Sequence, residues 1–429
     1  MKRRQFLTCA PVAAAALLTG CGGGEEDSPN PFPSPSTPPD TTPGPSPTPS
    51  PSPTPSPSPS PSPSPAPPPS PSPSPPPQQP SEGSMPAWRQ GMAVGEWRQI
   101  PNSALSSAPI TVRSAGNTGP ESKIIAWNSF AIDTRDSTVY SPANGGHHDY
   151  AGNEVNSIRL SDDAPLWIER RAATSGNQVV ENTTHYADGR PTSRHTFYGA
   201  VCNEVRNRVM VISGSRWGNG WVTSATDGFN LSSNDWDLAR TYPDVPSAAV
   251  ALAATAFVEH KVSGDIYAFG NYGVFRWLNA SNTWSQVVSN STIYGFGAAA
   301  ALDTRRNRIL VVGGSAAFDH GVYTLGANTT QNVSFTGPAA GAMPNVGNGS
   351  GMVYEPWLDA FLVRLSGAGG TVYRIDAQTF AVDTLPTSGG SAVPNAINGV
   401  WRRFLFAPKL GGIVYAPAYS SNMWFLRTT

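Results

Sequence analysis

The chain has 429 residues, a formal net charge of −1 and only 13% charged residues. This low, balanced charge argues against nucleic acid as a partner and against a basic membrane-binding surface. More than half of the 44 prolines lie between Pro29 and Pro80, whereas all 12 tryptophans, 13 tyrosines and 6 histidines lie from Trp88 onward. The folded part is therefore predicted to be residues 86–429, which is long enough for one large β domain.

The first twenty residues have the pattern of an export signal. A basic tetrapeptide precedes an apolar run over residues 6–18, and Leu18-Thr19-Gly20-Cys21 resembles the cleavage box of bacterial lipoproteins. The start is also similar to a twin-arginine signal, although Lys2 stands where such signals usually carry Ser or Thr. These resemblances imply a signal peptide over 1–20 and an acylated Cys21 that anchors the protein in the outer membrane. An ordinary secretory signal cut nearby is the alternative.

Residues 21–85 are dominated by proline alternating with serine. Proline at every second position favours extended polyproline II, which rises ~3.1 Å per residue, over any packed structure. We therefore predict a disordered linker that acts as a stalk between the lipidated cysteine and the folded domain.

From Trp88 onward, one tight turn between two apolar runs recurs six times. The six instances are residues 131–140, 201–210, 257–267, 301–310, 353–362 and 406–414. Asp, Asn and Gly at these turns favour hairpins, because they form local hydrogen bonds or adopt positive φ. Six hairpins at regular intervals predict a repeat protein with six blades.

The other strands of each unit have their own pattern. Second strands end in small residues: Gly145-Gly146, Ser213-Gly214, Gly270, Gly313-Gly314 and Ser366-Gly367. Third strands carry an aromatic-centred run, and fourth strands are marked by Trp167, Trp236, Trp284, Val333 and Val382. A diglycine, a tyrosine-like position and a tryptophan resemble the kelch repeat, over almost all of residues 90–429. The resemblance implies an all-β, six-bladed β-propeller.

The two ends of the domain complement each other. The sixth unit stops at Thr429 after its third strand, whereas residues 95–101 have the pattern of a fourth strand without a blade. Pairing the two closes the ring and removes open sheet edges. We therefore predict that Trp97 packs in the last blade, in the place that Trp167 takes in the first.

Candidate catalytic residues gather between the first and second hairpins. If second strands end near the axis, we expect His147 or His148 to meet Arg194 and His195 across neighbouring blades. Histidine exchanges a proton near neutral pH, Tyr150 or Tyr186 can protonate a leaving oxygen, and Arg194 can neutralise a carboxylate. Propeller-type ulvan lyases are similar in architecture and in this residue usage. The resemblance implies a polysaccharide lyase acting on uronate-containing glycans. From their own chemistry, His148, His195, Tyr150 and Arg194 are the candidate catalytic set.

A binding module is the other hypothesis, and it is the one we favour from the sequence. An exported, monomeric propeller would then present its channel mouth to an extracellular or periplasmic glycan or protein. The ligand-binding candidates are Asn128, His147, His185, Tyr186 and Trp217. In the plainest interpretation, the same side chains only hydrogen-bond loops and fill the mouth of the channel.

Metal and copper chemistry are not expected. Galactose oxidases, which are also kelch-like, use a tyrosine cross-linked to cysteine, a Tyr-His tandem and a histidine from a late blade. Here Cys202 is the one thiol after Cys21, no Tyr-His tandem occurs, and blades five and six contain no histidine. Adjacent strand residues point to opposite faces, so His147 and His148 are not predicted to share an ion. We therefore predict no metal or cofactor, and a buried core position for Cys202.

Overall fold

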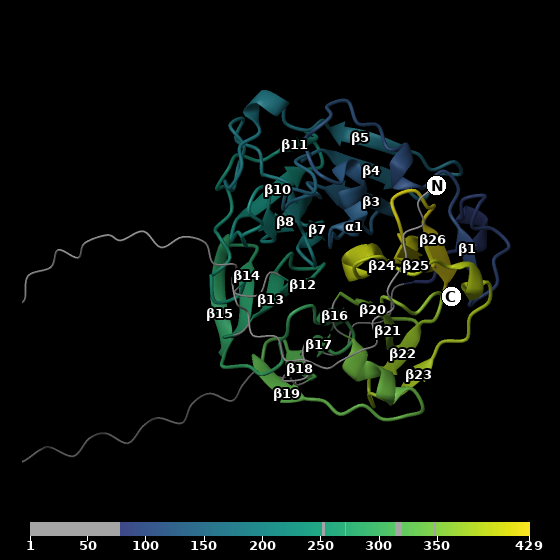
Figure 1. The fold of residues 1–429 in the computed structure, drawn as a ribbon. Helices are drawn as coiled ribbons and strands as arrows, with labels where there is room; N and C mark the ends of the chain where they lie inside the picture. Colours follow the sequence, from purple (N-terminus) through teal and green to yellow (C-terminus); the bar gives the residue numbers. More distant parts are fainter. Residues whose placement is uncertain (1–77, 251–253, 271, 314–319, 347–348) are drawn as a thin grey trace, which may run out of the picture. The chain divides into compact units, whose positions relative to one another are not determined.

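The computed structural model describes residues 78–250, 254–270, 272–313, 320–346 and 349–429. The predicted signal peptide, Cys21 and most of the predicted linker lie outside these residues. The described residues form six four-stranded antiparallel sheets, whose innermost strands contact one another in sequence order and return from the sixth to the first (Figure 1). This ring is a six-bladed β-propeller, which confirms the predicted fold class.

Each blade runs from an innermost strand at the channel to an outer edge strand. Blade 1 contains β2 (Ala131–Asp133), β3 (Thr138–Pro142), β4 (Val155–Arg159) and β5 (Trp167–Arg171), and blade 2 contains β7 (Ala200–Asn203), β8 (Arg208–Ile212), β10 (Thr226–Asn230) and β11 (Asp235–Trp236). Blade 3 contains β12 (Ala256–Glu259), β13 (Ile266–Gly270), β14 (Gly273–Leu278) and β15 (Thr283–Ser289), and blade 4 contains β16 (Ala299–Asp303), β17 (Arg308–Val312), β18 (Gly321–Thr324) and β19 (Thr329–Asn332). Blade 5 contains β20 (Gly351–Glu355), β21 (Ala360–Arg364), β22 (Tyr373–Asp376) and β23 (Val382–Thr384), and blade 6 contains β24 (Phe404–Ala407), β25 (Gly412–Tyr415), β26 (Trp424–Arg427) and β1 (Trp97–Gln99).

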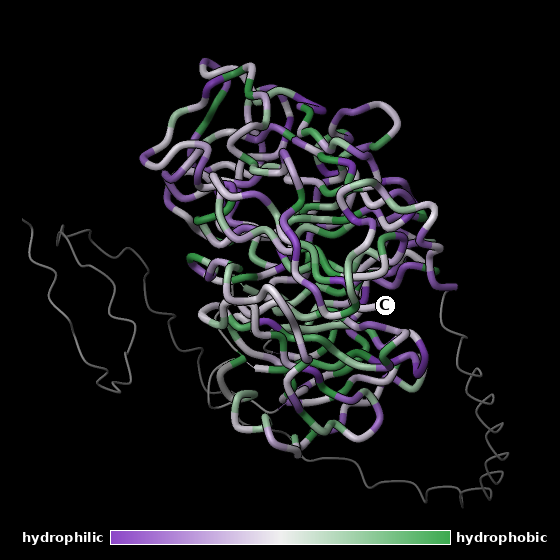
Figure 2. Tube along the Cα trace, turned by 90° about the vertical axis from the view of Figure 1, so that its right-hand side faces the viewer, coloured by the Kyte–Doolittle hydropathy of each residue, from purple (hydrophilic) through white to green (hydrophobic). Residues whose placement is uncertain are grey.

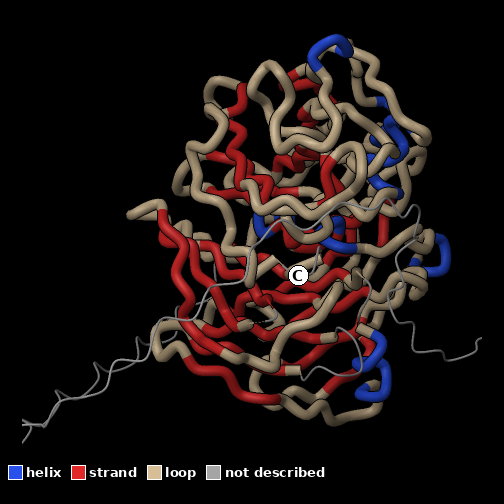
Figure 3. The backbone as a smooth tube through the Cα atoms, turned by 60° about the vertical axis from the view of Figure 1, so that its left-hand side comes forward, coloured by secondary structure: helices blue, strands red, loops and turns tan. Residues whose placement is uncertain are grey.

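The remaining elements are short. A ribbon that the sequence pattern did not predict pairs β6 (Arg194–His195) with β9 (Ser215–Arg216). The helical segments of the described chain are α1 (Ser122–Ile125), η1 (Glu82–Ser84), η2 (Leu105–Ser107), η3 (Gly119–Glu121), η4 (Gly176–Gln178), η5 (Ala340–Asn345), η6 (Gly390–Ala392), η7 (Trp401–Arg403) and η8 (Pro408–Leu410). Apart from η1, which precedes the first strand, they lie in connections between strands (Figure 3). No helix among the described residues is long and apolar enough to cross a membrane.

The predicted hairpin turns are present in all six blades, and each turns on a residue with left-handed backbone. These residues are Ser137, Asn207, Gly264, Asn307, Asp359 and Gly411. Asn, Asp and Gly tolerate this conformation better than other residues do. Turn chemistry therefore explains why the first two strands of every blade pair where they do.

Apolar side chains fill the space between neighbouring blades. Between blades 1 and 6, Ile132 and Ile158 pack in one cluster with Leu405 and Phe425. Figure 2 shows the same segregation, with hydrophobic positions along the strands and hydrophilic ones mainly in the loops. Burying each such side chain contributes about 1.5–3 kcal/mol, so blade packing supplies most of the stability. Cys202 is fully buried in the core cluster of blades 1 and 2, as predicted.

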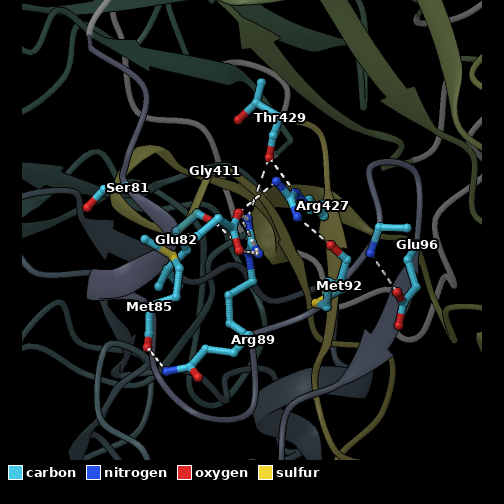
Figure 4. Close-up of polar contacts among 12 residues, drawn as sticks. Ser81, Glu82, Met85, Arg89, Met92, Glu96, Gly411, Arg427 and Thr429 are labelled. Atoms are coloured by element: carbon cyan, nitrogen blue, oxygen red, sulfur yellow. Dashed lines mark hydrogen bonds and ion pairs between the residues drawn. The ribbon is translucent and has the colours of Figure 1, made fainter.

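The N-terminal strand closes the ring as predicted. Strand β1 pairs antiparallel with β26, with Trp97 opposite Leu426. Trp97 is buried, packs in the cluster between blades 5 and 6, and donates its indole N–H to the carbonyl of Gly370 at 3.0 Å. The arm before β1 joins this closure, because Glu82 pairs with Arg427 at 2.6 Å (Figure 4).

The channel is crossed by two contacts between opposite blades. Arg402 of blade 6 binds both carboxylate oxygens of Glu259 in blade 3, at 2.9 and 2.7 Å. Although burial opposes ionisation, the charges of Arg402 and Lys261 hold the pKa of Glu259 below its usual value. The hydroxyl of Tyr198, which precedes blade 2, lies 2.8 Å from the carbonyl of Ser350 at the start of blade 5. Both contacts place protein atoms across the axis.

A left-handed residue recurs six positions before the end of the innermost strand in five blades, and the equivalent position in blade 3 lies outside the described residues. It is Trp127, Phe197, Gly297, Gly349 and Trp401 in blades 1, 2, 4, 5 and 6. Backbone hydrogen bonds join several of them around the axis, including Phe197 N–H to Trp127 O at 2.8 Å. Phe197 and Trp401 are buried and pack against each other and Tyr198. Aromatic rings therefore fill the channel near the end at which the innermost strands begin.

Replacing Trp97 with alanine tests the closure. The substitution removes a buried indole and its hydrogen bond, so we expect the free energy of unfolding to fall by about 3–5 kcal/mol in urea titrations. Val94, which precedes the same strand and is exposed, provides the control: Val94→Ala should change stability by less than ~0.5 kcal/mol. Equal, small effects of the two changes would contradict the closure.

Glu355 predicts a pH dependence of stability. It is fully buried at the end of β20, and burial raises its pKa from 4.5 to about 7, although Thr428 and the Trp357 N–H hydrogen-bond to the carboxyl. A raised pKa means that the folded chain holds a proton that the unfolded chain releases. This contribution is full below pH ~4.5 and is lost as the pH rises through about 7.

We therefore expect the melting temperature to decline between about pH 5 and pH 8 more steeply in the native protein than in Glu355→Gln. The glutamine is neutral throughout and keeps the shape and hydrogen bonds of the acid. Scanning calorimetry across this range measures both slopes, and identical slopes would show that Glu355 does not titrate in it.

Candidate functional site

The predicted site lies at the channel mouth where the innermost strands begin, between blades 1 and 2. The turn after β3 is joined to the β6–β9 ribbon by backbone hydrogen bonds: Gly145 N–H to Arg194 O at 2.9 Å and His147 N–H to Arg216 O at 3.1 Å. Gly146 has φ 85°, and a Cβ there would lie 2.5 Å from His195 N. Only glycine permits this approach, as predicted for the end of this second strand.

His195 and Asp149 form a hydrogen-bonded pair across the two blades. His195 Nε2 lies 2.8 Å from Asp149 Oδ2, and the carboxylate also accepts a hydrogen bond from Thr118 at 3.3 Å. Burial lowers the pKa of His195 despite Asp149. Burial alone would raise the pKa of Asp149, but the hydrogen bonds from His195 and Thr118 and the charges of the neighbouring histidines together hold it below its usual value. At neutral pH the pair is thus a neutral imidazole beside a carboxylate, the arrangement of a general base or a metal ligand.

The two adjacent histidines diverge, as predicted, but for a different reason. His147 and His148 both have left-handed backbone, with φ 40° and 60°, so they belong to a tight turn rather than a strand. The ring of His147 lies 5.8 Å from that of His195. The ring of His148 lies 5.5 Å from that of Trp217, and its Nε2 is 3.7 Å from a carboxylate oxygen of Glu181. His147 therefore lies with Asp149 and His195 in one cluster, the mouth cluster. His148 faces the neighbouring loop.

Arg194 and Tyr150 are completely buried. The guanidinium of Arg194 pairs with Asp227 and bonds the carbonyl of Ala225 at 3.1 Å. The hydroxyl of Tyr150 donates to Glu154 at 3.0 Å, and burial together with Glu154 raises its pKa. Both polar ends are thus engaged inside the protein. The structure places Arg194 next to His195 in β6. The guanidinium of Arg194 and the hydroxyl of Tyr150 are not presented at the mouth.

The ligand-binding candidates are also mostly internal. Asn128 is buried and accepts the N–H of Thr196 at 2.7 Å, and Tyr186 is buried with its hydroxyl donated to Ala151 O at 2.7 Å. Burial raises the pKa of Tyr186 to about 12. His185 binds Asp227 at 2.7 Å, and Trp217 is buried. Among the five, His147 alone is strongly exposed.

Sequence reasoning left two mouth residues out of the candidate set. Asp149 lies in the same turn as the predicted histidines, and the pairing of a carboxylate with histidine was the available signal. Trp127 directly precedes Asn128; its ring lies 5.3 Å from that of His195 and its side chain is 38% exposed. No local pattern marked it, because its position is defined only by comparison with the equivalent residue in the other blades.

Fold and site together define a six-bladed β-propeller with a histidine–carboxylate cluster at one channel mouth. No family model matches the sequence, and no curated protein matches it either. Solved structures with a related fold include a gluconolactonase from Xanthomonas campestris, at 10% identity and a TM-score of 0.41 over 77% of this chain and 91% of that one. Another is YjhT, at 10% identity and a TM-score of 0.43 over 74% and 95%.

Arg194→Ala tests the structural role of this arginine. The change leaves the buried carboxylate of Asp227 with His185 alone, so we expect a loss of about 3–5 kcal/mol in urea unfolding. The control removes an exposed partner: Arg159 pairs with Asp136 at 3.3 Å, with both side chains 40% exposed or more, and Arg159→Ala should cost less than ~1 kcal/mol. A fully stable Arg194→Ala protein would show that Asp227 does not need this partner.

Proposed function

We propose that the protein is a glycan-binding propeller that holds an oligosaccharide at the mouth between blades 1 and 2. The observation that carries this proposal is Trp127. Blades 4 and 5 have glycine at the equivalent left-handed position, and Phe197 and Trp401 are buried there among the aromatic rings that fill the channel. A left-handed tryptophan costs about 1–2 kcal/mol, and packing does not explain one that is 38% exposed.

The surroundings of Trp127 suit a sugar. Indole faces stack on the apolar faces of sugar rings, and the nearby side chains of His147 and Asp149 can hydrogen-bond hydroxyl groups. Two more exposed aromatic residues extend the surface: Phe296, 6.4 Å from Phe197, and Trp221, 69% exposed, which follows the Gly220 that packs on His147. The lipobox-like Cys21 and the Pro-Ser stalk support a location at the outer membrane, and the repeat pattern supports a kelch-like subclass.

A polysaccharide lyase is the second candidate, and the His195–Asp149 pair favours it. A neutral histidine oriented by a carboxylate can take the proton next to a uronate carboxyl. The predicted acid and cation are a weaker match, because the hydroxyl of Tyr150 and the guanidinium of Arg194 are engaged in buried pairs. His147 is the exposed group beside His195 that could protonate a leaving oxygen.

Trp127→Gly separates binding from folding. The variant restores the residue of blades 4 and 5, so the fold should be preserved or slightly stabilised. We expect it to lose at least tenfold in affinity for glycans bound by the native protein, measured by glycan array and then by calorimetry. Leu238→Ala, at an exposed apolar position outside the mouth, is the control and should bind normally. Unchanged glycan affinity in Trp127→Gly would refute this binding mode.

An activity assay on the native protein distinguishes a glycan-binding module from a lyase. Uronate-containing polysaccharides are incubated with the native protein while the ultraviolet absorbance of unsaturated sugar ends is followed. Affinity without absorbance supports the binding module. Absorbance that is lost in a folded His195→Gln variant supports the lyase.

A further inference from the structure

Three possible metal ligands converge at the mouth. One donor atom from each of His147, Asp149 and His195 lies within 4.8 Å of the other two, and the His195–Asp149 pair is already at 2.8 Å. Ligand atoms bound at ~2.0–2.2 Å from one ion are roughly 3–3.5 Å apart. The side chain of His147 is exposed, so it is the one that can move to complete this spacing.

Two of the three groups, Asp149 and His195, are held by independent contacts from the two blades. Asp149 is clamped by the segment before α1, because its carbonyl accepts the N–H groups of Thr118 and Gly119 at 3.1 and 2.9 Å. Thr118 also orients the carboxylate through its hydroxyl. His195 is fixed in the β6–β9 ribbon opposite Ser215. Such outer contacts are what a metal site uses to orient its ligands.

The turn itself has a strained backbone conformation, held by hydrogen bonds to the β6–β9 ribbon and to the segment before α1. His147 and His148 are consecutive left-handed residues without glycine, and each costs about 1–2 kcal/mol. Their effect is to direct His147 and Asp149 toward His195 while His148 faces Trp217. The expectation of no metal rested on the alternation of adjacent strand residues, and this turn does not follow that alternation.

We propose that His147, Asp149 and His195 bind one divalent transition-metal ion, for which zinc is the probe. Two imidazoles and one carboxylate match the ligand preferences of zinc and its neighbours in the first transition row. Three protein ligands leave coordination positions open toward the mouth beside Trp127. There, resting on the proposed function, an oxygen atom of the bound sugar would complete the coordination.

A second cluster of potential ligands shows why the mouth is preferred. Asp133, Cys202 and Glu204 also converge, but cations of the protein already occupy this place. Arg135 pairs with Asp133 at 2.6 Å and Lys261 pairs with Glu204 at 3.0 Å. Burial also raises the pKa of the Cys202 thiol, which disfavours the thiolate that a metal requires. At the mouth cluster, no lysine or arginine ion pair with Asp149 occurs among the described residues.

The test is zinc binding by the full-length chain, freed of any purification tag and of metal. Calorimetry should show one site in the native protein, and His147→Ala should weaken it at least tenfold. His147 is exposed, so this change should leave the melting temperature unaltered. The matched control is His148→Ala, which removes the adjacent imidazole outside the cluster and should retain native affinity. Asp149→Asn should weaken zinc binding as His147→Ala does.

Cobalt gives a second readout, because its visible ligand-field bands report coordination directly. These bands should appear in the native protein and in His148→Ala and be absent in His147→Ala. No zinc site in the native protein, or equal zinc affinity in His147→Ala and His148→Ala, would overturn the proposal. Zinc binding without any glycan affinity would leave the metal site standing and refute only the proposed function, since the two are measured separately.

Discussion

The ion pair between Arg402 and Glu259 is the constraint on which the rest of this propeller depends. It joins blade 6 to blade 3 across the axis, and both side chains are largely buried. Breaking either partner leaves a buried charge, which typically costs about 3–5 kcal/mol. Together with the plug of Phe197, Tyr198 and Trp401 it also fills the channel with protein. A ligand is thereby restricted to the mouths, and at one of them the loops of blades 1 and 2 bring the histidines together.

The left-handed residue before the innermost strand serves packing in some blades, and in blade 1 we propose that it serves recognition. The innermost strands of blades 1, 2, 4, 5 and 6 are each preceded by a left-handed residue, and carbonyl and amide groups at this level link neighbouring blades. Glycine meets the requirement at the lowest conformational cost, as at Gly297 and Gly349. Phe197 and Trp401 recover that cost by burial. Trp127 does so only in part, which is why its remaining exposure points to a ligand.

The sequence predicted what local chemistry controls. Turn residues such as Asn207 and Asp359 marked the hairpins, and the unmatched strand around Trp97 marked the closure. Side-chain partners far apart in sequence were not predictable. Arg194 has the charge expected of a catalytic cation, and only the fold reveals that this charge is paired with Asp227. The geometry of the turn at His147 was not predictable from the sequence either. The rule that successive side chains point to opposite faces applies to strands, and His147 lies in a left-handed turn.

The strained turn at His147 and His148 depends on the closure of the propeller ring. A turn with two successive left-handed histidines is stable only if its surroundings hold it, and here the supports come from the segment before α1 and from the β6–β9 ribbon. The first belongs to blade 1 and the second to blade 2, so the distance between His195 and Asp149 follows the angle between these blades. In a closed ring that angle is fixed by the other interfaces together. The pairing of β1 with β26 therefore supports the geometry of a site in which neither strand takes part.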